Sequence, residues 1–137
     1  LCLIVSKDGT HMSYARAGHP KLVRIDAVSN RVDSVDVGGL ALGLVNDPAK
    51  FEAMLDEVTI PLIPGERYLI YTDGLTEALN PNRECYGYER LLELLSGAGK
   101  LTTPEAMINA IMKDVKTFTR GAQYHDDLTI LGFQVTE

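Results

Sequence analysis

Residues 68–78 read YLIYTDGLTEA, a β-rich apolar run that ends abruptly in a polar turn. Tyr, Leu, Ile and Thr favour a strand over residues 68–72. Asp73 follows this strand, and Gly74 permits a sharp turn and a close approach of the backbone to a ligand. A carboxylate at the end of a buried strand is costly unless a cation, a backbone donor or a basic side chain pairs with it. The segment therefore predicts both a core strand and a candidate site.

Short apolar runs separated by turn residues lie before this segment. They predict a hairpin over residues 1–6 and 11–17, and further strands over 22–25 and 31–37. Residues 40–48 are predicted as a loop. Residues 51–62 are predicted as a strand that turns back at Pro64-Gly65, forming a second hairpin with residues 68–72.

The second half of the chain predicts two amphipathic helices and a returning strand. Residues 87–95 place their leucines on one face. Thr103 is expected to N-cap a helix that begins at Pro104 and carries an apolar stripe from Met107 to Phe118. Residues 128–135 are apolar on both faces, which predicts a strand buried in a layered core. This order indicates an α+β fold with antiparallel sheet.

Composition is typical of one domain over residues 1–137, with 45% hydrophobic residues and a net charge of −6. The acidic balance and the scattered basic residues argue against nucleic acid as a partner. Cys2 and Cys85 fit neither a disulfide framework nor a zinc site, so a reducing, cytoplasmic compartment is expected. No apolar run approaches the roughly 20 residues that span a bilayer. Because Leu1 is not Met, the chain is interpreted as a piece of a longer protein.

Three short segments place polar groups at junctions between apolar structure and a turn: residues 17–20, 71–74 and 125–129. In the last, Asp126 and Asp127 are adjacent, and neighbouring strand residues point to opposite faces, so only one can face a given site. Asp73 and one of these two could supply the hard oxygen ligands that Mg²⁺ or Mn²⁺ prefers.

The same residues can also be interpreted as purely structural, with no part in catalysis or metal binding. Asp73 could N-cap a short helix over residues 74–79. Asp126 and Asp127 could be solvated turn residues with local backbone hydrogen bonds. His19, which precedes Pro20, could mark only a bend at a sheet edge. Residue types alone leave these alternatives open.

Taken in order, five segments resemble the SpoIIE/RsbU-type protein phosphatases, a bacterial branch of the metal-dependent type 2C serine/threonine phosphatases. They read SYARAGHP (13–20), ALGL (41–44), IPGERYLIYTDGLTEA (63–78), YG (86–87) and DDLT (126–129). The resemblance implies two packed antiparallel sheets, a β-sandwich flanked by helices, with two Mn²⁺ or Mg²⁺ ions held at one edge.

Carried over by position, the resemblance assigns roles to four residues and marks two more as candidates. Asp73 and Asp126 are expected to be metal ligands, and Gly74 the adjoining backbone position. Asp127 is expected to orient water or the ligand shell. Gly18 and His19 match a family motif and are candidates only.

The reaction implied by the resemblance is hydrolysis of phosphoserine or phosphothreonine on a regulatory partner, typically an anti-sigma factor antagonist. Water made more acidic by two cations would attack phosphorus in line, with no covalent intermediate. The alternative is a non-catalytic binding module that recognises a phosphoprotein. The phosphatase and binding-module hypotheses differ in whether the natural protein carries an additional metal-ligating Asp-Gly segment before Leu1.

The chain departs from the family pattern in lacking the earlier Asp-Gly segment that bridges both metals. Asp8-Gly9 is a poor substitute, because it lies in a predicted hairpin turn. The chain is therefore expected to be the C-terminal portion of the domain, incomplete at the N-terminus. Alone, it is expected to bind metal weakly and to be a weak or inactive catalyst. An exposed sheet edge is expected to favour homodimerisation.

Overall fold

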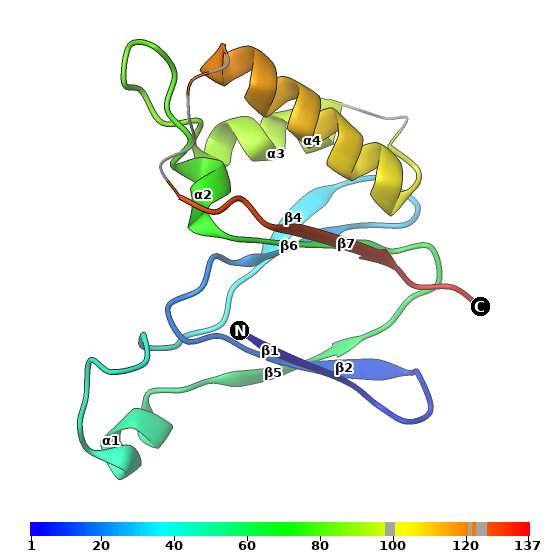
Figure 1. The fold of residues 1–137 in the computed structure, drawn as a ribbon. Coiled ribbons are helices and arrows are strands. Elements are labelled where there is room, and N and C mark those ends of the chain that lie inside the picture. Colours follow the sequence, from blue (N-terminus) through cyan, green and yellow to red (C-terminus); the bar gives the residue numbers. More distant parts are fainter. Residues whose placement is uncertain (98–100, 121, 123–125) are drawn as a thin grey trace.

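Two antiparallel sheets and a pair of helices stack as three layers in the computed structural model (Figure 1). It describes residues 1–97, 101–120, 122 and 126–137. The first sheet has the strand order β1-β2-β5 and comprises β1 (Cys2–Val5), β2 (His11–Ala15) and β5 (Glu57–Pro61). The second has the order β4-β3-β6-β7 and comprises β3 (Leu22–Ile25), β4 (Val32–Val35), β6 (Arg67–Tyr71) and β7 (Ile130–Gln134).

The longer helices cover the outer face of the second sheet, whereas one short helix lies at the end of β6 and the other lies on the side of the first sheet, just before β5 (Figure 1). The covering pair are α3 (Tyr88–Gly97) and α4 (Pro104–Thr119). The short helices are α1 (Pro48–Ala53) and α2 (Asp73–Thr76), of which α2 begins where β6 ends. None of the helices in the described part of the chain combines the length and the apolar character needed to cross a bilayer.

Strand β6 lies between two hydrophobic cores because its successive side chains point to opposite faces. Tyr68 packs in the core between the two sheets, together with Met12 and Tyr14 of β2. Leu69 packs in the core beneath the helices, together with Ile111 of α4. All five side chains are fully buried. The α+β fold predicted from the sequence, with two antiparallel sheets and flanking helices, is confirmed.

Several local predictions are also confirmed. Strands β1 and β2 form the first hairpin. The side chain of Thr103 accepts a hydrogen bond of 3.1 Å from the backbone N–H of Ala106, so it caps α4 as expected. Asp8 accepts hydrogen bonds from Ser6 and Thr10, which makes residues 7–10 an ordinary hairpin turn.

The predicted second hairpin is wrong, because β5 and β6 belong to different sheets. Strand β5 pairs with β2, which places Ile60 opposite Met12, whereas β6 pairs with β3 and β7. The turn at Pro64-Gly65 thus carries the chain from one layer to the other. A strand buried on both faces needs hydrogen-bonded neighbours on both sides, and β6 finds them in β3 and β7.

Residues 48–53 form a helix, although a loop ending at Pro48 and a strand beginning at Phe51 were predicted. Asp47 is the N-cap, and its side chain accepts hydrogen bonds from the N–H groups of Ala49 and Lys50. Pro48 occupies the first turn, where its missing N–H costs nothing. Local capping therefore outweighed the strand-like composition.

The strand predicted over residues 128–135 exists, but it lies at the edge of its sheet and not in a central position. Its outer face contacts α4, and Phe133 stacks on Tyr68 with ring centroids 5.1 Å apart. Leu131 is nevertheless 55% exposed. Ile4 and Val5, on the edge strand β1, are also exposed. Apolar side chains on two edge strands are thus open to solvent within the described residues, and homodimerisation through such an edge stays a prediction.

Helices α3 and α4 are joined by an ion pair. The Arg90 guanidinium donates hydrogen bonds of 2.8 and 3.0 Å to Asp114, and the Tyr86 hydroxyl donates one of 2.8 Å to the same carboxylate. Arg90 also lies over the rings of Tyr86 and Phe118. These hydrogen bonds, those of Arg90 foremost, hold the pKa of Asp114 below its ordinary value of 3.8.

We predict that Asp114→Asn destabilises the protein by about 1 kcal/mol at neutral pH, since the pair is partly screened by solvent. A carboxylate with a lowered pKa stabilises the folded state above its unfolded pKa, and this contribution is lost as the pH falls through the folded pKa. The difference in the free energy of unfolding between the wild type and the variant, measured with urea, should therefore become smaller below pH 3.8.

The matched control is Asp36→Asn, because Asp36 pairs with Lys21 at the surface and is more exposed than Asp114. It should lose less stability than Asp114→Asn. Equal losses in the two variants would contradict a special role for the Arg90–Asp114 pair.

Candidate functional site

Thr72 joins the end of β6 to the segment that leads into β7. Its backbone N–H donates to the carbonyl oxygen of Thr129 at 3.1 Å, and its hydroxyl donates to the carbonyl oxygen of Asp127 at 2.8 Å. The Thr72 Oγ1 atom also accepts a hydrogen bond of 3.0 Å from the N–H of Thr129. Three hydrogen bonds from one residue thus hold two segments together that are more than fifty residues apart in the sequence.

Gly74 lies directly against the second of these segments. A Cβ atom at this position would be 2.5 Å from the carbonyl oxygen of Asp127 and 3.4 Å from that of Asp126. No side chain fits at that distance from backbone atoms. The glycine is therefore required by the close approach of two backbone segments, whereas the sequence predicted an approach of the backbone to a ligand.

Asp73 lies between Thr72 and Gly74 and is the first residue of α2. Its carboxylate is exposed and accepts a hydrogen bond of 3.1 Å from the N–H of Gly74. Thr72, and not Asp73, is the N-cap, and the helix ends at Thr76. The alternative in which Asp73 caps a helix over residues 74–79 is therefore wrong.

Asp126 and Asp127 are both exposed. Asp126 Oδ1 accepts a hydrogen bond of 2.8 Å from the N–H of Asp127, as expected for a turn residue. Asp127 contacts Thr72 through its backbone carbonyl. The predicted role of the Asp127 side chain stays a prediction, and His125 lies outside the described residues.

Gly18 and His19 form a bend between the two sheets. Gly18 has a left-handed φ of 75°, and a Cβ atom there would be 2.6 Å from Cβ of Ala41. The carbonyl oxygen of His19 accepts a hydrogen bond of 3.0 Å from Arg16, and its ring Nδ1 lies 3.1 Å from the carbonyl oxygen of Pro20. These contacts favour the reading of this motif as a structural bend.

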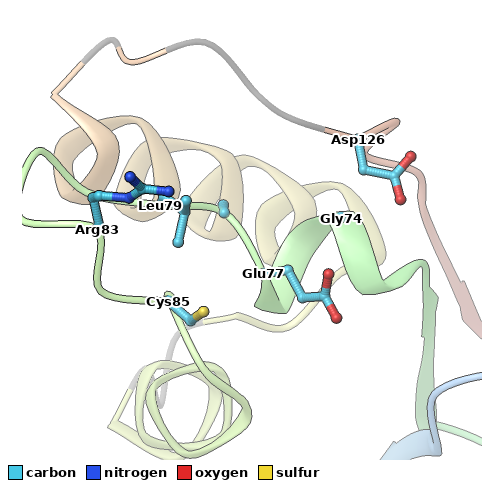
Figure 2. Close-up of a pocket in the computed structure, with 7 residues that line it drawn as sticks. Gly74, Glu77, Leu79, Arg83, Cys85 and Asp126 are labelled. Carbon is cyan, nitrogen blue, oxygen red and sulfur yellow. The ribbon is translucent and has the colours of Figure 1, made fainter.

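A pocket of about 360 Å³ opens beside the junction, and Gly74 and Asp126 belong to its lining (Figure 2). Glu77, Leu79, Arg83 and Cys85 also line it. Sequence reasoning gave Arg83 no role. The available signal was its position directly after Asn80-Pro81-Asn82, a run of residues typical of a tight turn.

Asp73 and Asp126 fit part of a divalent-cation site. Carboxylate oxygens are the ligands that Mg²⁺ and Mn²⁺ prefer. The hydrogen bonds found for each carboxylate come from the next residue's N–H and involve one oxygen, so lone pairs remain for a cation. Across residues 1–97, 101–120, 122 and 126–137, no three His, Cys, Asp or Glu side chains gather closely enough to hold a metal ion. The described residues thus supply fewer ligands than such an ion takes.

Known proteins share this architecture. A sequence model of the family described as Stage II sporulation protein E (SpoIIE) matches residues 1–136. The phosphatase domain of SpoIIE from Bacillus subtilis, in a crystal presoaked with Mn, superposes with a TM-score of 0.70 at 18% identity, over 98% of this chain and 55% of that one. The RsbU and RsbW domains of a Mycobacterium tuberculosis protein give a TM-score of 0.61 at 25% identity, over 91% of this chain and 32% of that one.

A curated relative, protein IcfG of Synechocystis sp., is 25% identical over 130 residues, which are 93% of this chain and 19% of IcfG. The chain thus spans about a fifth of IcfG and about half of the SpoIIE phosphatase domain. The two sheets and their covering helices have the fold of part of a PP2C-type phosphatase domain. The chain belongs to the SpoIIE family.

We predict that Gly74→Ala loosens the junction between Thr72 and Asp127. The added methyl group must displace a backbone carbonyl, so we expect a loss of about 1–3 kcal/mol in the free energy of unfolding. Gly97→Ala is the matched control, because a Cβ atom there would meet no atom of the described residues within 4 Å. Urea unfolding of both variants tests this, and a Gly74→Ala variant as stable as Gly97→Ala would contradict the packing argument.

Proposed function

We propose that the chain is part of a metal-dependent phosphoprotein phosphatase that hydrolyses phosphoserine or phosphothreonine. The observation that carries the proposal is the junction at Thr72 and Gly74, which sets Asp73 beside the Asp126–Asp127 segment. Membership of the SpoIIE family supports the reaction class. The pocket beside Asp126 offers room for a phosphorylated side chain.

The proposed cofactor is Mn²⁺ or Mg²⁺, with Asp73 and Asp126 as ligands from this chain. When bound, such a cation neutralises phosphoryl oxygens and lowers the pKa of water, which are the two needs of phosphate hydrolysis at neutral pH. Asp73 and Asp126 would orient the cation through carboxylates fixed by adjacent N–H groups. The proposed role of Asp127 is to hold water or the ligand shell in place.

The proposed substrate is a phosphorylated regulatory protein of the anti-sigma factor antagonist type, in the cytoplasm. This partner class rests on the family resemblance and is supported by the similarity to a protein that carries RsbU and RsbW domains. We further propose that the chain is the C-terminal portion of its phosphatase domain, with the remaining metal ligands outside these 137 residues. The partial ligand set among the described residues favours this arrangement.

The same partial ligand set favours one alternative, a non-catalytic module that binds a phosphoprotein without hydrolysing it. The two functions differ in their requirement for metal. A binding module would keep its partner affinity after chelation, whereas a phosphatase would lose turnover.

We predict that Asp73→Asn or Asp126→Asn in the full-length protein lowers Mn²⁺-dependent hydrolysis of p-nitrophenyl phosphate more than about 100-fold. Loss of residues that only support metal ligands already costs 10–100-fold, so loss of a ligand should cost more. The variants should also require more Mn²⁺ for half-maximal activity. Removal of metal by a chelator should abolish turnover of the wild type.

Asp8→Asn is the control, because Asp8 lies in a hairpin turn and bonds only to neighbouring residues. Its activity should match that of the wild type. Near-normal rates in Asp73→Asn and Asp126→Asn would exclude the assigned ligands, and an inactive wild type that still binds a phosphoprotein would favour the binding module.

A further inference from the structure

Arg83 has an unusual backbone conformation for a residue with a long side chain. Its φ is 63°, in the left-handed region that glycine and asparagine adopt more readily. It belongs to the turn between Leu79 and Cys85, which are joined by an isolated antiparallel bridge. The side chain is exposed, and a glycine would adopt this backbone conformation with less strain, so the arginine invites a functional explanation.

Hydrogen bonds around Asn80 fix this turn. The Asn80 carbonyl accepts from the N–H of Arg83 at 2.9 Å, and its side-chain oxygen accepts from the N–H groups of Asn82 and Glu84, each at 2.9 Å. The Asn80 amide donates to the Glu84 carboxylate at 2.7 Å. Glu84 is thereby engaged with Asn80, so the acid nearest in sequence to Arg83 already has a partner.

The base of the turn is anchored to the helical layer. Tyr86, which follows Cys85, is buried and donates its hydroxyl hydrogen bond to Asp114 of α4. Its backbone N–H donates to the carbonyl of Ala78 at 2.9 Å. The turn is therefore held at both ends, and Arg83 projects from a fixed position.

The Arg83 side chain lines the same pocket as Asp126, at a distance from it. Figure 2 shows Arg83 beside Leu79 at one end of the pocket, with the carboxylates of Glu77 and Asp126 toward the other. Among the described residues, no carboxylate lies within ion-pair distance of Arg83. The pocket thus combines an acidic end, where the metal site is proposed, with an unpaired cation at the opposite end.

This separation decides which part of a substrate Arg83 meets. Under the proposed function, a phosphate undergoing hydrolysis must lie toward Asp126, one of the two proposed metal ligands and part of the acidic end of the pocket. Arg83 would then face a neighbouring part of the same peptide. The guanidinium fork binds carboxylates through paired hydrogen bonds, and the apolar wall at Leu79 suits the methylene groups of a glutamate.

We propose that Arg83 is a specificity-determining residue that binds an acidic side chain of the phosphopeptide, offset in sequence from the phosphorylated residue. The inference rests on the proposed function for the identity of the peptide, and it adds the feature that the peptide must carry. Arg83 is not assigned to the reacting phosphate.

The test uses the full-length protein with Mn²⁺ and a set of synthetic phosphoserine peptides. Each pair of peptides differs only by Glu or Gln at one position on either side of the phosphoserine. In the wild type, Glu at one or more positions should raise kcat/KM about threefold to tenfold over Gln, mainly through KM. In Arg83→Asn this preference should vanish, while turnover of p-nitrophenyl phosphate is unchanged.

Three substitutions of Arg83 and one control separate a loss of peptide preference from a loss of folding. Asn and Gly tolerate the left-handed backbone, so Arg83→Asn and Arg83→Gly should melt at or above the wild-type temperature. Arg83→Lys keeps the charge without the fork and should retain part of the preference. Arg120→Asn is the matched control. Arg120 also has a left-handed φ, of 51°, but it lines a different pocket, which it shares with Asn80.

Peptide binding, measured by fluorescence anisotropy with the same Glu and Gln pairs, separates this inference from the proposed function. If the wild type hydrolyses no substrate, the phosphatase proposal fails, and a Glu preference in binding that is lost in Arg83→Asn still supports the inference. The inference is overturned if the wild type does not distinguish Glu from Gln at any position in hydrolysis or binding. It is also overturned if the preference survives in Arg83→Asn, or if that variant loses p-nitrophenyl phosphate turnover to the same extent as peptide turnover.

Discussion

Strand β6 packs against two hydrophobic cores, one on each face, and the rest of the structure depends on this constraint. Tyr68 faces the sheet of β1, β2 and β5, and Leu69 faces the helices. The Tyr68 hydroxyl donates to Glu66 at 2.6 Å, and burial raises the pKa of this tyrosine, so it stays protonated as a donor. A strand buried in this way cannot shift in register without exposing one core, since a slip of one residue exchanges its faces. The end of β6 is therefore a fixed point.

The candidate site is built on that fixed point. Thr72 extends β6 by one residue and holds the Asp127–Thr129 backbone with three hydrogen bonds. Gly74 allows the same two segments to touch. The segments that carry Asp73 and Asp126 thus meet through backbone and Thr72 contacts, because the strands that they follow are packed side by side. The turn that carries Arg83 is anchored to α4 through the hydrogen bond between Tyr86 and Asp114. Because the candidate site lies at the ends of packed strands, the position of Arg83 relative to that site is also fixed.

Sequence reasoning succeeded where a local pattern alone decides the structure. The Thr103 cap with Pro104, the first hairpin and the apolar stripe of α4 each follow from residues within a few positions of one another. It failed where partners were distant in sequence. Pairing of β5 with β2 and not with β6 depends on how two layers pack, and Pro64-Gly65 serves equally well in a hairpin or in a crossing between sheets.

The sequence by itself determined the α+β class, most of the elements and the ordered motifs that mark the SpoIIE family, because these depend on residue type, spacing and order. The tertiary structure alone decided that β7 is an edge strand, that Thr72 is the residue binding Asp127, and that Arg83 lines the pocket of Asp126. Each of these is a contact between segments far apart in the chain. Such contacts arise from the packing of whole layers, which no single segment of sequence encodes.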